Sequence, residues 1–230
     1  MNLLVDDVPY DVMVPRTLRG TILVLPGWDF PRDGWIKNTD LERRAAEKGY
    51  ALILPEMQKT LYESAYYPET QMKWNATPGG KFIKERLLAE IPPRHGLLRT
   101  GGRNFLLGLS TGGRGVALIA LENPGRFMAG ASISGDFLQE RIPADRLMTA
   151  VYGSYSIFPE RWLGRDNPAR RASEWKMPLY LAHGSSDGIV PEEQSRLFYQ
   201  ALKEKSPAVR VEYRVIPGGG HDYKVWGGEL

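Results

Sequence analysis

The chain of 230 residues contains no cysteine. This absence excludes disulfide bonds, cysteine-ligated zinc, iron–sulfur clusters and a thiol nucleophile. It does not indicate a compartment, because a chain without cysteine folds equally well in reducing and in oxidising surroundings.

Long hydrophobic runs are also missing. No apolar stretch approaches the ~20 residues that cross a bilayer, and Asp6 and Asp7 interrupt the apolar residues at the N-terminus. We therefore expect neither a membrane span nor a signal peptide, and a cytoplasmic location by default. A secreted or periplasmic location would require that a leader had been removed.

Neither sign of charge is in large excess, since 30 Lys and Arg stand against 27 Asp and Glu. The basic residues are scattered along the chain, which argues against nucleic acid as a partner. The composition, 42% hydrophobic and 25% charged, is typical of a globular protein, and 230 residues fit one core. We predict one domain over residues 1–230, and the sequence does not indicate its oligomeric state.

The chain does contain a regular alternation of strand and helix patterns. Short runs rich in Val, Ile and Leu predict buried strands at 21–26, 51–55, 104–109, 130–134 and 178–182. Helical patterns occupy 40–48, 81–90, 112–122 and 191–205, and Pro92 is expected to stop the second. This alternation predicts an α/β fold with a mostly parallel sheet flanked by helices on both faces.

Four further segments depart from that rhythm. Residues 3–14 predict one or two antiparallel strands at one edge, and the polar–apolar alternation of 209–216 predicts a half-solvated strand near an edge. Residues 57–80 and 141–175 are long, irregular and rich in aromatic residues. We expect these two insertions either to line a pocket or only to cover the core.

The string Gly108-Leu-Ser110-Thr-Gly112 joins a predicted buried strand to a predicted helix. In a nucleophile elbow the serine lies on a sharp, strained turn, so the residues two before and two after it must be small. The turn presents the hydroxyl at the carboxyl end of the sheet. Ser110 is therefore the candidate nucleophile.

A serine needs a general base, which is almost always histidine. The chain has three: His95, His183 and His221. His95 lies in a Pro-rich connection and is most simply a surface residue, and His183 ends a strand, where an imidazole usually satisfies the backbone. His221 follows three glycines after the last strand and is the preferred base.

The acid should follow a strand between the serine and this histidine. Asp187, after the strand at 178–182, fits this place, although it could instead cap the following helix. Asp136, after the preceding strand, is the alternative acid. Asp222 is adjacent to His221 and a poor candidate. Backbone N–H groups of Thr111 and of Trp28, in the loop after the first core strand, are the candidate oxyanion hole.

These residues resemble the α/β-hydrolase superfamily, and more closely its esterase family that includes S-formylglutathione hydrolases, feruloyl and acetylxylan esterases and mycolyltransferases. The resemblance covers nearly the whole chain and is carried by 10–15, 108–115, 123–127, 132–135, 183–191 and 219–223. It implies Ser110 as nucleophile, Asp187 as acid and His221 as base. It departs at Pro26-Gly27, where a His-Gly pair is common.

We therefore expect a serine carboxylic-ester hydrolase that forms an acyl-enzyme on small or aromatic acyl esters and needs no metal or organic cofactor. Candidate pocket walls are the aromatic residues Trp28, Tyr66, Trp74, Trp162 and Trp226. Acyltransferase, thioesterase or peptidase chemistry on the same triad remains open. A hydrolase-fold binding protein without turnover is the alternative outside enzymes.

Overall fold

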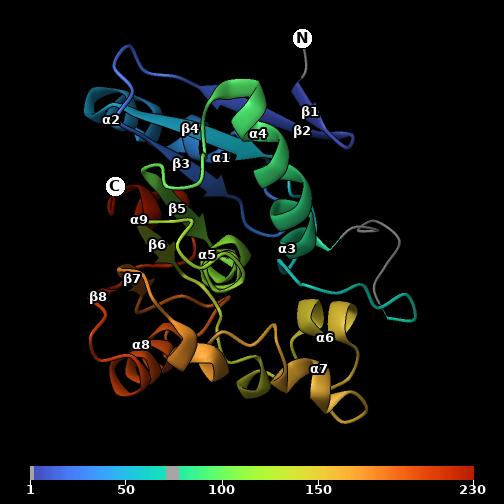
Figure 1. Ribbon diagram of the computed structural model, residues 1–230. Coiled ribbons are helices and arrows are strands. Elements are labelled where there is room, and N and C mark those ends of the chain that lie inside the picture. Colours follow the sequence, from blue (N-terminus) through green and yellow to red (C-terminus); the bar gives the residue numbers. More distant parts are fainter. Residues whose placement is uncertain (1–2, 71–77) are drawn as a thin grey trace.

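The computed structural model describes residues 3–70 and 78–230, and a single sheet forms its centre (Figure 1). The strands of this eight-stranded sheet lie in the order β1-β2-β4-β3-β5-β6-β7-β8. Their bounds are β1 (Leu3–Val5), β2 (Val8–Met13), β3 (Gly20–Leu25), β4 (Tyr50–Pro55), β5 (Asn104–Leu109), β6 (Ala129–Ile133), β7 (Leu179–Gly184) and β8 (Val211–Ile216).

The pairings β4–β3, β3–β5, β5–β6, β6–β7 and β7–β8 are all parallel, whereas β2 pairs antiparallel with both β1 and β4. The central strand β3 pairs on both sides, so that Thr21 lies opposite both Ala51 and Asn104. The predicted parallel sheet and the predicted antiparallel N-terminal strands are thereby confirmed. β8 forms one edge, as its alternating pattern predicted.

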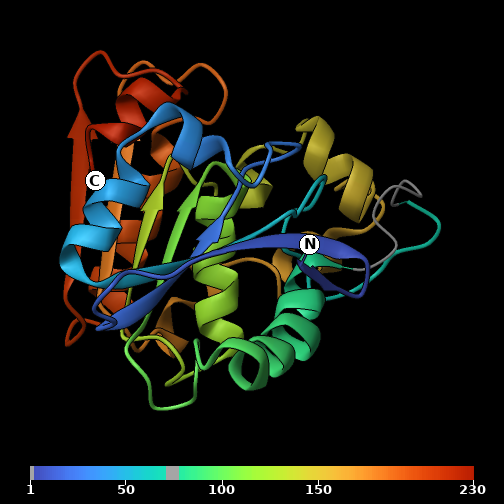
Figure 2. The ribbon, with the colours of Figure 1, turned by 90° about the horizontal axis from the view of Figure 1, so that it is seen from above.

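Helices cover both faces of the sheet (Figures 1 and 2). One face packs against α5, α8 and the helical segment before β5, and the other face against α1, α2 and α9. The helical bounds are α1 (Gly34–Asn38), α2 (Leu41–Lys48), α3 (Gly79–Phe82), η1 (Ile83–Leu87), α4 (Leu88–His95), α5 (Thr111–Glu122), η2 (Gln139–Arg141), α6 (Arg146–Tyr152), α7 (Pro159–Leu163), η3 (Ala169–Glu174), α8 (Glu193–Lys205) and α9 (Tyr223–Gly227).

The helix before β5 corrects one prediction, because it does not stop at Pro92. It runs on through α4 to His95 and ends at Gly96, which has a φ of 69°. A proline inside a helix leaves the carbonyl four residues earlier without its N–H donor. Here that carbonyl, of Leu88, accepts a hydrogen bond of 3.1 Å from Arg126, which supplies the missing donor.

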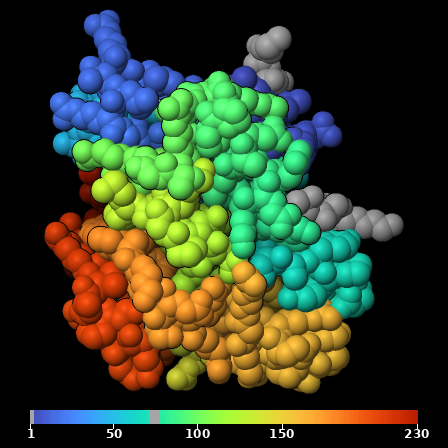
Figure 3. All heavy atoms as spheres, in the orientation of Figure 1, coloured from blue at the N-terminus to red at the C-terminus, as the bar shows by residue number. Residues whose placement is uncertain are grey.

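The described part of the first aromatic-rich insertion, residues 57–70, packs against the second insertion beyond the carboxyl ends of the strands (Figures 1 and 3). A small hydrophobic cluster joins them and consists of Leu61, Met148, Val151, Tyr152 and Trp162. Residues 57–70 thus share a core with the segment that contains α6 and α7. Among the residues described, no helix has the length and apolar character that crossing a membrane requires.

Candidate active site

Ser110 lies between the end of β5 and the first turn of α5, in a strained backbone conformation with φ 54° and ψ −127°. A side chain at Gly108 would collide with the carbonyl of Gly112, and one at Gly112 would collide with the carbonyl of Leu25. The turn therefore requires glycine at both positions, as the elbow pattern predicted. Ser110 itself is 8% exposed.

The loop after β3 packs directly beside Ser110. A Cβ added to Gly27 would lie 3.2 Å from the Ser110 Cβ, which is a tight contact, so glycine at this position favours the close approach of the two backbones. Tyr62 holds the loop in place by donating a 2.8 Å hydrogen bond from its hydroxyl to the carbonyl of Pro26. The following residue in the loop is Trp28, whose N–H is a predicted oxyanion donor.

Thr111 is the first residue of α5, so its N–H has no intrahelical acceptor. The N-terminus of a helix carries a partial positive charge, which favours an oxyanion at this point. The two predicted donors, Thr111 and Trp28, therefore belong to segments that meet at Ser110. Their role as an oxyanion hole stays a prediction.

Asp187 and His221 are joined by a hydrogen bond of 2.7 Å between Asp187 Oδ2 and His221 Nδ1. The Asp187 side chain is fully buried and the His221 side chain is 8% exposed. A carboxylate on Nδ1 holds the imidazole in the tautomer whose Nε2 can accept a proton. The structure thus brings together the two residues that the sequence predicted as acid and base.

Both oxygens of Asp187 are held by donors. Oδ1 accepts the backbone N–H groups of Ile189 and Val190, each at 2.9 Å, while Oδ2 lies 3.4 Å from His183 Nε2. Burial alone would raise the pKa of Asp187, but these hydrogen bonds and the one to His221 outweigh it and hold the pKa well below its usual range. These contacts favour the ionised form of Asp187, which holds its own loop through Ile189 and Val190 as well as orienting His221.

Trp226 of α9 supports the other side of His221. Its ring lies 5.0 Å from the imidazole, edge to face, and its Nε1 donates a 3.1 Å hydrogen bond to Ser134 Oγ. Ser134 follows β6 and has a φ of 52°. The imidazole is thus held between a carboxylate and an indole that is itself anchored on the neighbouring strand end.

The Ser110 hydroxyl makes no hydrogen bond to His221 within residues 3–70 and 78–230. Catalytic hydrogen bonds are often long without substrate and tighten only in the substrate complex. Ser110, Asp187 and His221 nonetheless follow β5, β7 and β8, whose carboxyl ends lie at one edge of the sheet.

The alternative acid, Asp136, lies in a different environment. It is buried beside Arg114, with 3.9 Å between Asp136 Oδ1 and Arg114 Nη1, and this oxygen accepts no hydrogen bond from the described residues. Burial raises the pKa of Asp136 to about 6, although the Arg114 charge opposes the rise. No hydrogen bond joins Asp136 to His221 in the described chain, which favours Asp187 as the orienting carboxylate.

Arg114 is a structural centre that the sequence analysis did not identify. It belongs to the first turns of α5, is fully buried, and donates hydrogen bonds to the carbonyls of Leu61 and Asp166 and to the side chain of Gln139. It also lies 3.2 Å from the hydroxyl of Tyr152. The elbow helix is thereby tied to both insertions. The only signal in the sequence was a charged residue inside the glycine-rich elbow string.

The two remaining histidines take structural positions. His183 is fully buried, bonded to Ser195 Oγ at 2.7 Å and to the carbonyl of Val190 at 2.9 Å, as expected for a histidine that satisfies the backbone. His95 accepts or donates a 2.9 Å hydrogen bond with the Tyr10 hydroxyl at the far end of the sheet. Asp222 caps α9 through the N–H of Val225.

The predicted pocket walls need correction. Trp162 and Trp226 are both fully buried, so neither faces an open pocket. Trp162 instead fills the cluster between the insertions and donates to the carbonyl of Gly153. Tyr66 is 39% exposed, Trp28 is partly buried against the same cluster, and Trp74 lies outside the described residues. Periodicity in loops could not distinguish an aromatic residue that packs from one that lines a pocket.

In the described part of the chain, no group of His, Asp and Glu is arranged to hold a metal ion. The candidate site consists of the strained Ser110 at the N-terminus of α5 and the Asp187–His221 pair, whose two residues follow the adjacent strands β7 and β8.

Comparison with known proteins agrees with this geometry. Residues 96–228 match the model of the prolyl oligopeptidase family. Poly(3-hydroxyoctanoate) depolymerase from Pseudomonas fluorescens is 24% identical over 183 residues, which are 80% of this chain and 57% of the depolymerase. The chain therefore spans little more than half the length of that curated relative.

Two solved structures illustrate the fold. MPT51 of Mycobacterium tuberculosis superposes with a TM-score of 0.81 at 17% identity. The superposition includes 100% of this chain and 94% of the MPT51 chain. S-formylglutathione hydrolase from Agrobacterium tumefaciens superposes with a TM-score of 0.76 at 18% identity. This superposition includes 96% of this chain and 85% of the hydrolase chain. The predicted α/β-hydrolase fold is thereby confirmed.

Proposed function

The chain belongs to the prolyl oligopeptidase family, and on that premise we propose that it is a serine hydrolase that cleaves carboxylic esters through an acyl-enzyme intermediate. The observation that carries the proposal is the 2.7 Å hydrogen bond between Asp187 and His221, at the same edge of the sheet as the strained elbow serine, Ser110. Together these two features are the parts of an acyl-transfer site.

In the proposed reaction His221 Nε2 takes the proton of the Ser110 hydroxyl as its oxygen attacks the ester carbonyl. The tetrahedral oxyanion accepts hydrogen bonds from the N–H groups of Thr111 and Trp28, and Asp187 stabilises the imidazolium. His221 then gives its proton to the leaving alcohol, and the acyl group stays on Ser110. Water, deprotonated by His221, attacks the acyl-enzyme and releases the acid.

The proposed substrates are small or aromatic acyl esters. Because the chain is similar to a poly(3-hydroxyoctanoate) depolymerase, we also propose 3-hydroxyacyl esters of medium length. Trp28 supports this class, because it belongs to the loop beside Ser110 and packs on the apolar cluster between the two insertions. An acyl chain on Ser110 would therefore meet aromatic and aliphatic surface.

Peptide hydrolysis is the second candidate, and the family match favours it. The same triad can cleave amides when the loops hold a peptide and His221 protonates the leaving amine. Thioester cleavage and acyl transfer to an alcohol differ from ester hydrolysis only in the leaving group or the acceptor, so a panel of substrates separates them.

The test is initial-rate hydrolysis over p-nitrophenyl esters from acetate to dodecanoate, methyl ferulate, an acetylated sugar, S-formylglutathione, a 3-hydroxyoctanoate ester and an N-acylamino-acid p-nitroanilide. Ser110→Ala should abolish turnover, whereas Ser173→Ala, which changes an exposed serine of η3, should not. A Ser110-dependent maximum on one ester class supports the proposal, and a maximum on the anilide favours the peptidase.

Labelling by an organophosphonate provides a second readout. Intact-mass measurement should find one phosphonyl group on the wild-type chain and none on Ser110→Ala. A folded protein that hydrolyses nothing in the panel and takes no label would contradict the proposal and favour a hydrolase-fold binding protein.

A further inference from the structure

Asp136 is a buried carboxyl group whose hydrogen-bonding capacity the described part of the chain leaves unused. Its Oδ1 is enclosed by protein and accepts no hydrogen bond from another described residue. Oδ2 accepts none either, and unlike Oδ1 it is not enclosed, so the exposed 8% of the side chain includes this oxygen. Buried polar groups in folded proteins are nearly always paired, so an unpaired carboxyl group that reaches the surface can pair with a ligand.

The segment after β6 brings Asp136 next to the candidate nucleophile. The N–H of Ser110 donates a 2.9 Å hydrogen bond to the carbonyl of Ile133, so β5 and β6 end at the same level. A Cβ added to Gly113 would lie 3.1 Å from the Cα of Gly135, because this segment packs on the first turn of α5. Asp136 is the next residue, and it therefore lies at the elbow.

The backbone that follows Asp136 is held in place by α8. The N–H groups of Phe137 and Leu138 donate to Oε1 of the buried Gln194, at 2.9 Å and 2.8 Å. The elbow helix on one side and Gln194 on the other thus fix the position of this residue. A fixed acceptor binds a donor without first having to be ordered, which favours selectivity.

The charges around Asp136 select the kind of group that can bind to it. Arg114 Nη1 lies 3.9 Å from Oδ1, which is too far for a hydrogen bond. The positive charges of Arg114 and of a protonated His221 both lower the pKa of Asp136, so both lie within electrostatic reach of it. These two charges would repel a cationic substrate group, and the carboxylate itself would repel an anionic one. A hydroxyl group meets neither repulsion, and its hydrogen bond to a carboxylate is charge-assisted.

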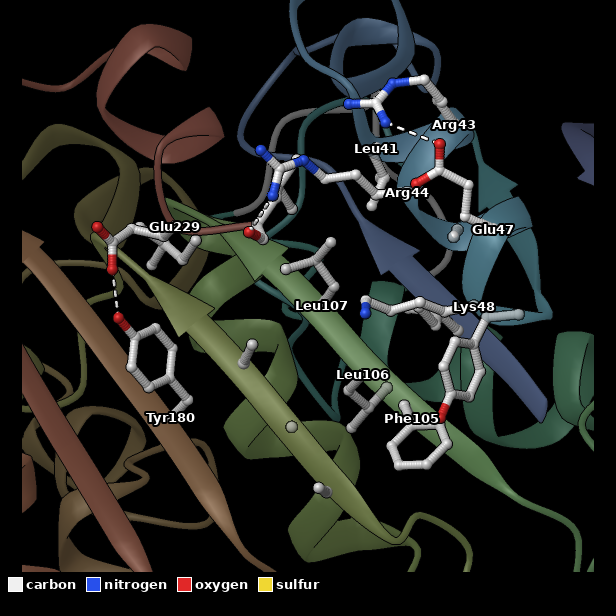
Figure 4. A pocket seen from close by; sticks show the side chains of 18 residues that line it. Leu41, Arg43, Arg44, Glu47, Lys48, Phe105, Leu106, Leu107, Tyr180 and Glu229 are labelled. Carbon is white, nitrogen blue, oxygen red and sulfur yellow. Dashed lines mark hydrogen bonds and ion pairs between the residues drawn. The ribbon is translucent and has the colours of Figure 1, made fainter. Parts of the chain in front are cut away.

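The surroundings of Asp136 are separate from a groove of about 580 Å³ on the α2 face of the sheet, which Figure 4 shows. That groove is lined by parts of β3, β5, β6, β7 and α2 and by the last two residues, and neither Asp136 nor the candidate triad lines it. A substrate of Ser110 must therefore be recognised at the carboxyl ends of the strands, where Asp136 lies.

We propose that Asp136 is a specificity-determining residue that accepts a hydrogen bond from a hydroxyl group on the acyl part of the substrate. The inference rests on the proposed function and singles out the 3-hydroxyacyl esters among the classes proposed above. In these esters the hydroxyl-bearing carbon is two bonds from the carbonyl carbon that Ser110 attacks, so the hydroxyl group stays close to the elbow in both half-reactions. Because one fixed acceptor approaches from the β6 side, one enantiomer at this carbon should be preferred.

The test measures kcat/KM at pH 8, where Asp136, with a pKa of about 6, is ionised. The substrates are the p-nitrophenyl esters of octanoate and of (R)- and (S)-3-hydroxyoctanoate. Wild type should prefer one 3-hydroxy enantiomer to octanoate. Asp136→Ala should lower this ratio about tenfold or more, since the acceptor is lost.

Two further variants serve as controls. Asp136→Asn keeps an acceptor oxygen and should lower the ratio less than Asp136→Ala does. Glu160→Ala removes an exposed carboxylate of α7 and should leave the ratio unchanged. Each ratio compares substrates on the same sample, so a smaller folded fraction in a variant does not alter it.

The failure of this inference can be told apart from failure of the proposed function. Ser110-dependent hydrolysis of octanoate, with a ratio that Asp136→Ala leaves unchanged, would overturn the role of Asp136 alone. Absence of all hydrolysis would contradict the proposed function and this inference with it. If Asp136→Ala instead lowers kcat/KM for 2-hydroxyethyl octanoate relative to butyl octanoate, the hydroxyl group belongs to the alcohol part and the proposal is wrong.

Discussion

Asp187 and Asp136 are two buried carboxyl groups whose surroundings move their pKa values in opposite directions. Asp187 is surrounded by donors that keep it ionised, whereas Asp136 has only a distant Arg114 and a pKa raised to about 6. The carboxylate that orients a catalytic imidazole must stay charged as the imidazolium forms. This difference favours Asp187 as the acid.

Asp187→Asn should therefore lower kcat by about 10³-fold to 10⁴-fold, since an amide can hold the wrong imidazole tautomer. Asp136→Asn, the matched control at the alternative position, should lower kcat by less than about tenfold. Steady-state kinetics on the best ester of the panel measures both. The opposite order of the two losses would mean that the acid follows β6.

The raised pKa of Asp136 also predicts how stability changes with pH. The ordinary pKa is 3.8 and the folded value is about 6, so the native state holds a proton that the unfolded chain has lost in this interval. Protonated Asp136 therefore contributes its full share to the free energy of unfolding below about pH 4, and this contribution is lost as the pH rises through 6. The total is at most about 3 kcal/mol.

Asp136→Asn should remove this loss, because an amide does not ionise. Urea unfolding at pH 5 and at pH 8 should find that wild type becomes less stable, relative to the variant, by about 1–3 kcal/mol between the two values. If the difference in free energy of unfolding between wild type and Asp136→Asn is the same at pH 5 and at pH 8, Asp136 is not protonated in the folded protein at pH 5.

The three candidate catalytic residues could be predicted from the sequence because their surroundings are local. Ser110 stands between two glycines, and Asp187 and His221 each follow a strand in the expected order. Arg114 could not be placed, because its partners come from segments far away in the chain. Burial of loop aromatics such as Trp162 is likewise a tertiary property.

At the scale of single elements, the elbow between β5 and α5 depends on contacts between backbones. A methyl group at Gly112 would meet the carbonyls of Leu25 and Pro26, which cannot move without shifting β3 and its loop. The elbow is thus fixed by the neighbouring strand as well as by its own turn.

Gly112→Ala should destabilise the protein by about 2 kcal/mol or more and lower kcat, because the displaced β3 loop carries the predicted oxyanion donor. Gly228→Ala is the matched control, since its added Cβ would meet only an ordinary contact of 3.4 Å at a helical φ of −67°. Urea unfolding and ester kinetics report the two effects. Equal stability of both variants would contradict the close packing described for the elbow.

The segment from α3 to α4 marks the limit of local prediction. Pro92 is a reliable helix breaker when only its own turn is considered, and the sequence indicated a stop there. The helix continues because Arg126, far along the chain, supplies a donor to the carbonyl of Leu88. The strand and helix positions elsewhere in the core followed from hydrophobic periodicity, which is a local property.

Glu122 joins three elements at the end of α5. It accepts from Arg165 at 2.8 Å, from Arg171 at 2.8 Å and from Lys84 at 3.2 Å. Burial would raise its pKa, but these cations outweigh burial and lower the pKa to about 2 from an ordinary 4.5. Its stabilisation is present above pH 4.5 and is lost as the pH falls through 2.

Glu122→Gln should lower the free energy of unfolding by about 1–3 kcal/mol at pH 7 and by less at pH 3. Glu160→Gln removes an exposed carboxylate 3.8 Å from Arg161 and should change stability by less than about 1 kcal/mol. Urea unfolding at the two pH values is the measurement. If the difference in free energy of unfolding between wild type and Glu122→Gln is as large at pH 3 as at pH 7, the Glu122 charge contributes little to stability.

At the scale of the whole molecule, the parallel sheet assembles the candidate site. The loops after β3, β5, β7 and β8 all leave the sheet at the carboxyl ends of these parallel strands, so residues from distant parts of the sequence meet there. This convergence could be predicted from the fold class. The packing of the two insertions on each other could not, because it depends on side-chain contacts between irregular segments.

Arg114 connects the elbow helix α5 to both insertions, so its replacement should lower the stability of the whole fold. Arg114→Met should destabilise the protein by about 3–5 kcal/mol, because it leaves several buried carbonyls and the Gln139 side chain without a donor. Tyr152→Phe removes one 3.2 Å contact with Arg114 and should cost about 1 kcal/mol. Urea unfolding measures both, and equal losses would contradict a central role for Arg114.

The sheet edges described above bear on how the protein behaves at high concentration. Within the described residues β1 comprises the three residues Leu3–Val5, and β8 carries Glu212 and Arg214 with Arg210 just before it. A short strand offers few hydrogen-bonding groups, and alternating charges resist burial against a foreign strand. The open sheet therefore presents poor templates for strand addition, and this should favour resistance to fibril formation.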